Sequence, residues 1–131
     1  MNQSILQFAL VVKDYDEAID FYVRKLHFQL IEDTQLDEHK RWVVIKPKGE
    51  GSCRILIAKA SNDKQKNSIG NQTGGRVFLF LHTDDIERDY NNLLNQNIRI
   101  VRELCHEPFG KVIVFEDLYG NLWDLIQPNM G

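Results

Sequence analysis

The pattern of apolar residues in this chain passes through the same order of predicted elements twice. Each half starts with a β-branched and aromatic strand, continues with an apolar stripe at helical spacing, and ends with further strands. A shift of about 71 residues aligns Leu10 with Leu81 and Asp14 with Asp85. A period this long with only two copies indicates a duplicated module and excludes a solenoid.

Both copies read as β-α-β-β-β, which predicts an α+β fold with mixed, curled sheets. In the first copy, Asp14 or Asp16 is expected to cap the helix, and in the second copy Asp84 or Asp85. The expected strands cover residues 5–12, 28–31, 41–45 and 53–58 in the first copy, and 77–81, 98–101, 112–115 and 122–126 in the second. We expect one domain over residues 1–131, with modules at 1–58 and 76–131 and a polar connector at 59–75.

The last two strands form a predicted antiparallel hairpin, whose turn is the segment Asp117-Leu-Tyr-Gly-Asn121. Asp117 can accept hydrogen bonds from backbone amides beyond it, and Gly120 tolerates a positive φ. Asp124 breaks the apolar pattern of the final strand. A buried carboxylate costs several kcal/mol unless a partner compensates it, so a metal, a cation or a donor on a ligand is expected beside Asp124.

Composition narrows the classes of partner. The chain is 43% hydrophobic and 27% charged, with a net charge of −3, so it lacks the basic stripe that nucleic-acid binding requires. No apolar run reaches the length of roughly 18 residues that a membrane span needs, and we expect a cytoplasmic protein. Cys53 and Cys105 lack the spacing of metal ligands, and the composition favours a reducing compartment and two buried, small hydrophobic side chains.

Several short segments together resemble the vicinal oxygen chelate superfamily. They are Val12-Lys-Asp14, Ala18-Ile-Asp-Phe-Tyr22, Leu26-His-Phe28 and Phe115-Glu-Asp-Leu-Tyr-Gly-Asn-Leu-Trp-Asp124. The superfamily includes glyoxalase I, extradiol dioxygenases, fosfomycin-resistance enzymes and bleomycin-binding proteins, and the likeness is strongest to its short glyoxalase-like members. One departure is His27, which stands where the family usually has Gly, so His27 is expected to adopt a positive φ.

The resemblance implies that the two modules form a cleft and that the protein is a homodimer with a small-molecule ligand. In metal-using members, four cleft residues bind the metal, and these positions fall on Gln7, Arg54, Phe78 and Asp124. Arg has no acceptor atom and repels a divalent ion. Gln7 and Asp124 alone would hold Zn, Ni, Mn or Fe only weakly, so no cofactor is expected.

Further residues are candidates for the lining of the cleft. A cationic and aromatic surface could be supplied by Arg41, Trp42, Phe78 and Phe80, although aromatic residues on strands can equally be ordinary core residues. His82 shares a face with Phe80, where it could act as an acid or base, or could hydrogen-bond to the turn at Asp84 and Asp85.

Two interpretations of the charged residues stay open. Arg54 either pairs with Asp124 or binds an anionic substrate. Glu107, in an expected rim loop, is either solvated or, together with Asp124, a catalytic carboxylate.

The sequence therefore supports two hypotheses for function. The first is a glyoxalase-like enzyme, related to lactoylglutathione lyase, that acts on a small oxygenated or thiol-conjugated metabolite. The second is a metal-free protein that binds and sequesters an aromatic or cationic small molecule, as bleomycin-resistance proteins do. Fold alone does not decide between them.

Overall fold

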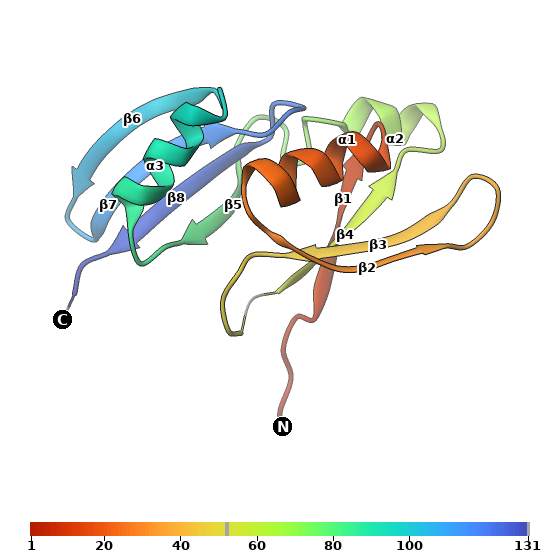
Figure 1. Cartoon of the computed structure of the whole chain (residues 1–131), viewed down its shortest axis with the longest axis horizontal. Helices are drawn as coiled ribbons and strands as arrows, with labels where there is room; N and C mark the ends of the chain where they lie inside the picture. The colour runs from red at the N-terminus through yellow and green to blue at the C-terminus, as the bar shows by residue number, and fades with distance from the viewer. Residues whose placement is uncertain (52, 131) are drawn as a thin grey trace. The chain divides into compact units, whose positions relative to one another are not determined.

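The computed structural model describes residues 1–51 and 53–130. The chain divides into two compact units, Met1–Ile69 and Gly70–Gly131, and the division falls inside the segment 59–75 that the sequence indicated as a connector. Each unit contains a four-stranded sheet, with strand order β1-β4-β3-β2 in the first and β5-β8-β7-β6 in the second (Figure 1). The predicted α+β architecture of tandem modules with mixed sheets is confirmed.

The elements of the first unit are β1 (Gln7–Val12), α1 (Tyr15–Ile19), a π-helical continuation η1 (Asp20–Lys25), β2 (Gln29–Gln35), β3 (Arg41–Lys46), β4 (Arg54–Lys59) and α2 (Asp63–Ser68). Those of the second are β5 (Val77–His82), α3 (Ile86–Asn95), β6 (Ile100–Glu107), β7 (Gly110–Glu116) and β8 (Leu122–Pro128). None of the helices in the described part of the chain is long and apolar enough to span a membrane.

Two strands extend well beyond their predicted ends. β2 was expected to stop at Ile31, but it continues to Gln35. Every residue of this strand is exposed. β6 was expected to stop at Val101 and continues to Glu107, which pairs with Gly110 at the start of β7. The loop expected around Glu107 is present but shorter, because Glu107 and Gly110 are paired strand residues and only Pro108 and Phe109 form the turn.

The strands β4 and β8 occupy equivalent central positions in the two sheets. β4 pairs parallel with β1 and antiparallel with β3, and β8 pairs parallel with β5 and antiparallel with β7. One face of each sheet carries the buried core of its unit. The adjacent residues Leu10, Ile57 and Val43 form the core row in the first sheet, and Leu125 and Ile113 lie side by side in the second.

The helix α3 lies along one face of the second sheet (Figure 1). Its residue Glu87 accepts a hydrogen bond from Lys111 of β7 (2.8 Å), and Ile86 N donates to Gln127 Oε1 of β8 (2.9 Å). Side chains alternate between the faces of a strand, so the even-numbered residues of β7 and β8 point away from α3. We call this side, away from the helix, the distal face of the second sheet.

The two predicted helix caps are present, and the residue that follows η1 has the expected backbone conformation. Asp14 caps α1 by accepting from Glu17 N (2.9 Å), and Asp85 caps α3 by accepting from Arg88 N (3.1 Å), as predicted. His27 closes η1 with φ 65°, which confirms the expectation for a position where the family has Gly.

The turn between β7 and β8 is organised by one buried carboxylate. Asp117 is 4% exposed and accepts hydrogen bonds from the backbone amides of Tyr119 and Asn121 and from Asn121 Nδ2, all at 2.9 Å. Gly120 has φ 96°, a conformation that other residues adopt only with strain. The predicted turn chemistry is confirmed, and it sets where β8 begins.

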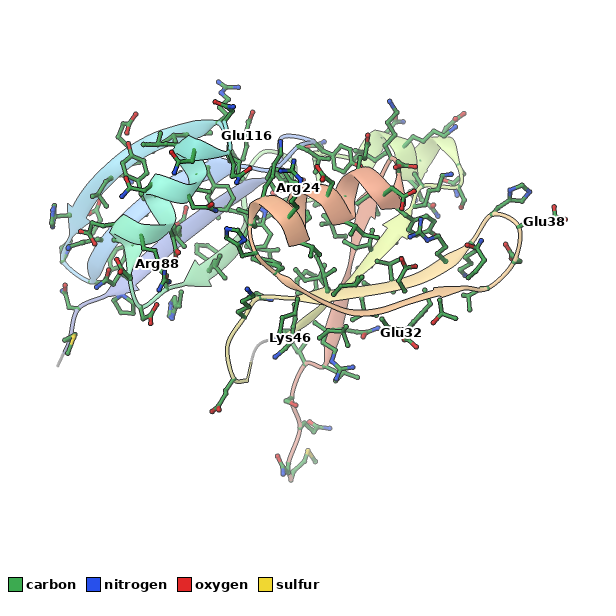
Figure 2. All side chains as sticks on the ribbon, in the orientation of Figure 1. Arg24, Glu32, Glu38, Lys46, Arg88 and Glu116 are labelled. Carbon is green, nitrogen blue, oxygen red and sulfur yellow. The ribbon has the colours of Figure 1, made fainter. Side chains whose placement is uncertain are left out.

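Replacing Asp14 by Ala is expected to lower the free energy of unfolding by about 1 kcal/mol, because Glu17 N then loses its hydrogen-bond acceptor. Urea titrations of the two proteins measure this difference. Glu38→Ala is the matched control, since Glu38 lies at the tip of the β2–β3 hairpin with its side chain 92% exposed (Figure 2). Equal losses in the two variants would contradict the role of Asp14 as a cap.

Candidate functional site

The distal face of the second sheet brings together residues from all four strands. Asp124 in β8 lies between Phe80 of β5 and Val114 of β7, and Val114 in turn lies beside Arg102 of β6. Residues that are direct partners in a ladder project to the same face. Phe80, Asp124, Val114 and Arg102 therefore form one row of side chains across the sheet.

A second row runs parallel to the first. It contains His82, Ile126, Val112 and Cys105, again from the four strands in order. The two inner residues of this row are apolar, and Val112 is only 3% exposed. The distal face therefore has an apolar centre with polar groups at both ends of the row.

Asp124 is the unusual member of this face. Its Oδ1 atom is buried, and no described residue provides a hydrogen-bond partner for it. Burial raises the pKa of the Asp124 carboxyl above its ordinary value, and the positive charge of Arg102 opposes this effect only in part. The fold thus holds the Asp124 carboxyl group in an environment that disfavours its negative charge, and its Oδ1 atom receives no hydrogen bond from the described residues.

Arg102, Cys105 and Glu107 form a hydrogen-bonded cluster on β6. Arg102 Nη2 donates to Cys105 Sγ (2.8 Å) and to Glu107 Oε1 (2.6 Å), and Cys105 Sγ donates to Glu107 Oε1 (3.2 Å). The hydrogen bond from the thiol and the ion pair with Arg102 lower the pKa of Glu107, and the same ion pair raises the pKa of Arg102. Glu107 is therefore a paired carboxylate on the strand.

The expectation that both cysteines are buried hydrophobic side chains was wrong. Cys53 and Cys105 are each partly exposed, and Cys105 lies between a cation and an anion. Sequence reasoning missed Arg102 and the role of Cys105 because β6 was predicted to end before them. The signal that could have found the pair is the spacing of Cys105 and Glu107, two residues apart on one extended strand.

The two phenylalanines of β5 that the sequence indicated as candidates, Phe78 and Phe80, differ in their pairing with β8. Phe80 is 66% exposed and lies next to Asp124, whereas Phe78 falls in an irregular segment of β5 between Val77 and Leu79. Gln7 pairs with Arg54 in the first sheet, and Phe80 pairs with Asp124 in the second. When the pairs Leu10–Ile57 and Leu81–Leu125 are taken as equivalent, Phe80 corresponds by position to Ala9.

His82 is exposed and reaches the distal face beyond Phe80. The turn that follows is held by other groups: Asp85 N donates to Thr83 Oγ1 (3.2 Å), and Arg88 on α3 pairs with Asp84 (2.9 Å; Figure 2). Within residues 1–51 and 53–130, no hydrogen bond joins His82 to the side chains of Asp84 or Asp85, so the structural role suggested for His82 is not the one this turn uses.

The first sheet separates the residues that the sequence grouped as a pocket lining. Arg41 N donates to the Tyr15 hydroxyl (3.2 Å), and the Arg41 guanidinium pairs with Asp33 (2.6 Å) and Asp16 (2.8 Å). These two carboxylates raise the pKa of Arg41 further above its ordinary value. Trp42 is the next residue along β3 and points to the opposite face, so the structure does not bring the two side chains together.

Arg54 and Gln7 lie side by side on the face of the first sheet that Trp42 shares. Arg54 is exposed, and its guanidinium forms no ion pair with any residue in the described part of the chain. Arg54 belongs to the first unit and Asp124 to the second, and the ion pair suggested between them stays a prediction.

The donor atoms present do not fit a metal site of the glyoxalase type. Of the four positions given by the resemblance, two hold an arginine and an aromatic ring. Among the described residues, no group of three or more His, Cys, Asp or Glu side chains is placed to hold a metal ion. Structural and catalytic metal sites need three or four such ligands, so we derive no chemical step through a metal.

Replacing Asp124 by Asn is expected to raise the free energy of unfolding at pH 7. Because the folded-state pKa of Asp124 is raised, the folded protein prefers the protonated carboxyl, and ionisation above that pKa lowers stability. Asn is never charged, so the gain should shrink as the pH falls through the folded-state pKa towards the unfolded value of about 3.9. Denaturant titrations between pH 7 and pH 4 measure it.

A loss of stability in Asp124→Asn at pH 7 would contradict this expectation. It would mean that a cation compensates the carboxylate in the fold, and Arg54→Met combined with Asp124→Leu would then test Arg54 as that cation. Losses that do not add in the double variant identify a direct pair.

Comparisons with known proteins agree with this architecture. The family model for the Glyoxalase/Bleomycin resistance protein/Dioxygenase superfamily matches residues 4–125. An uncharacterized protein of Shewanella frigidimarina is 59% identical over 130 residues, which cover 98% of this chain and 96% of that protein.

Solved structures with similar folds include UcmS2, with a TM-score of 0.82 and 26% identity over 96% of this chain and 98% of that one. TnmS3, described as an antibiotic binding protein from Streptomyces sp. CB03234, has a TM-score of 0.78 and 27% identity over 98% of each chain. The match of the family model to almost the whole chain, over two four-stranded mixed sheets, shows that the protein belongs to the Glyoxalase/Bleomycin resistance protein/Dioxygenase superfamily.

Proposed function

We propose that this protein binds a small aromatic molecule that carries a positive charge or a hydrogen-bond donor, and that it does so without a resident metal. The observation that carries the proposal is the buried Oδ1 of Asp124, for which no described residue supplies a donor. An unsatisfied buried acceptor costs about 1–3 kcal/mol. A donor on a ligand removes that cost, and this makes Asp124 a point of recognition.

The surroundings of Asp124 determine the shape of the ligand. Phe80 is the direct neighbour of Asp124 in the ladder and leaves 66% of its surface exposed, which is unusual for a large aromatic side chain. Val114 and Ile126 extend the apolar surface on the same face. A flat, apolar body with one polar group therefore matches this face, because its ring can stack on Phe80 while the polar group reaches Asp124.

The charge of Asp124 favours a cationic ligand. Its raised pKa records the cost of a carboxylate in this environment, and a cation beside the carboxyl group lowers that cost directly. Arg102 lies at the far end of the same row and already pairs with Glu107. The positive end of the ligand is thus expected at the Phe80 side of Asp124.

The similarity to TnmS3 supports a binding role, since that protein is described as antibiotic binding. The degenerate set of donor atoms at Gln7, Arg54, Phe78 and Asp124 supports the same class of function. We also expect a homodimer in the cytoplasm, as the resemblance and the composition suggest.

A glyoxalase-like enzyme acting on a small oxygenated metabolite is the second candidate. The observation in its favour is that two carboxylates, Asp124 and Glu107, project from the same distal face, where either could act as a base. Turnover of hemithioacetals of methylglyoxal by the purified protein, lost in Asp124→Asn, would favour this candidate over simple binding.

Binding of two planar probes tests the proposal. The cation 9-aminoacridine should bind at least about tenfold more tightly than the anion 9-anthracenecarboxylate, a difference of about 1.4 kcal/mol, and Asp124→Asn should remove that preference. Phe80→Ala should weaken binding of the cation by about 0.5–1.5 kcal/mol through lost stacking. Isothermal calorimetry or fluorescence quenching measures the affinities.

Phe109→Ala is the matched control for Phe80→Ala, because Phe109 is also an exposed phenylalanine (56%) but lies in the turn between β6 and β7. The affinity of the Phe109→Ala variant for 9-aminoacridine should equal that of the unmodified protein. Equal binding of cation and anion, or equal effects of the two Phe variants, would overturn the proposed site.

The purified protein is expected to contain well under one equivalent of Zn, Ni, Mn or Fe, and a chelator should leave its melting temperature unchanged. The reason is that Gln7 and Asp124 are the only oxygen donors among the four positions that bind metal in related enzymes. Elemental analysis with and without EDTA treatment measures this. One tightly held equivalent, lost in Asp124→Ala, would show that the site does bind a metal.

A further inference from the structure

We infer that Cys105 is a nucleophilic thiol that captures α,β-unsaturated carbonyl compounds on the distal face of the second sheet. The inference rests on the proposed function for the location of the ligand and adds a covalent step to it. It starts from the geometry of Arg102, Cys105 and Glu107, in which a nucleophile, a base and a cation are within hydrogen-bond reach of one another.

Each partner of Cys105 has a separate effect on the sulfur. Glu107 Oε1 accepts a hydrogen bond from Sγ at 3.2 Å, while Arg102 Nη2 donates one to Sγ at 2.8 Å. The 2.6 Å ion pair between Arg102 and Glu107 holds both groups in position.

The face around Cys105 suits a carbon electrophile with an apolar body. Val112 and Ile126 continue the row that starts at Cys105, and Phe80 exposes its ring in the neighbouring row. The buried Oδ1 of Asp124, for which the described chain provides no donor, independently indicates that this face receives a ligand. The Cys105 thiol thus lies on the same face as Asp124 and Phe80, the residues on which the proposed ligand site rests.

The reaction is a conjugate addition that needs no oxidant. The thiol proton passes to the Glu107 carboxylate, and Sγ forms a bond to the β-carbon of the unsaturated carbonyl compound. The π electrons of the C=C bond then form the new C=C bond of the enolate, and the π electrons of the carbonyl group move to its oxygen. The Arg102 guanidinium is the cation available to stabilise the enolate charge. The proton on Glu107 then returns to the α-carbon, which leaves a thioether and restores the carboxylate.

The second cysteine provides an internal reference. Cys53 is also partly exposed, but the hydrogen bond recorded for its sulfur goes to the backbone oxygen of Arg54 at 3.6 Å. Among the described residues, no charged side chain forms a hydrogen bond with Cys53 Sγ. A difference in reactivity between the two thiols therefore reports the effect of Arg102 and Glu107, because exposure alone does not separate them.

The test uses 4-phenyl-3-buten-2-one as the electrophile and intact-protein mass spectrometry as the readout. Cys53→Ser, which keeps Cys105, should form the adduct at least about tenfold faster at pH 7 than Cys105→Ser, which keeps Cys53. In the Cys53→Ser background, Arg102→Met and Glu107→Gln should each slow the reaction at least about tenfold.

Arg99→Met in the same background is the matched control, because Arg99 forms an exposed ion pair with Glu116 (3.3 Å; Figure 2) in the same unit and should leave the rate unchanged. Melting temperatures of all variants check that they fold. Equal rates at the two cysteines would overturn the inference. Unchanged rates in both Arg102→Met and Glu107→Gln would do the same, since Cys105 would then be an ordinary accessible thiol.

Binding of 9-aminoacridine to Cys105→Ser separates this inference from the proposed function. If that binding persists while no adduct forms in Cys53→Ser, the covalent step alone is refuted. If the adduct forms at Cys105 but the cation does not bind the unmodified protein, the proposed function fails and the thiol chemistry stands.

Discussion

The central strand β8 pairs along both of its edges, and the position of the candidate site depends on this constraint. Parallel pairing with β5 and antiparallel pairing with β7 leave its side chains only two directions. Trp123 and Leu125 occupy one direction and are 2% exposed. Asp124 must therefore occupy the other, and a shift of one residue would place the carboxylate in the core and two large apolar side chains outside it.

Irregular pairing in β6 brings the remaining polar groups together. The register between β6 and β7 shifts between Ile100 and Arg102 and again between Arg102 and Cys105. Such bulges bend a strand and redirect its side chains, and they occur often beside functional sites. Here the second shift keeps Arg102 and Cys105 on one face although they are three residues apart, and the cluster with Glu107 follows from that.

Local signals in the sequence were sufficient for much of the fold. The order of elements, the caps at Asp14 and Asp85 and the turn at Asp117 all depend on residues within a few positions of one another. The length of β6 and the ladder neighbours of Asp124 depend on pairing across strands, which periodicity does not encode.

Two aspartates of the final hairpin differ in whether the fold itself satisfies their carboxylate groups. Asp117 accepts three hydrogen bonds from its own turn, and removing it would leave those donors without an acceptor. Asp124 lies seven residues later along the same hairpin, and its buried Oδ1 accepts none from the described residues. The turn thus uses its carboxylate entirely for structure, and by holding β8 in register it keeps the second carboxylate on the distal face. Among the described residues no donor satisfies that oxygen, which is why we propose recognition at Asp124 and expect a structural role for Asp117.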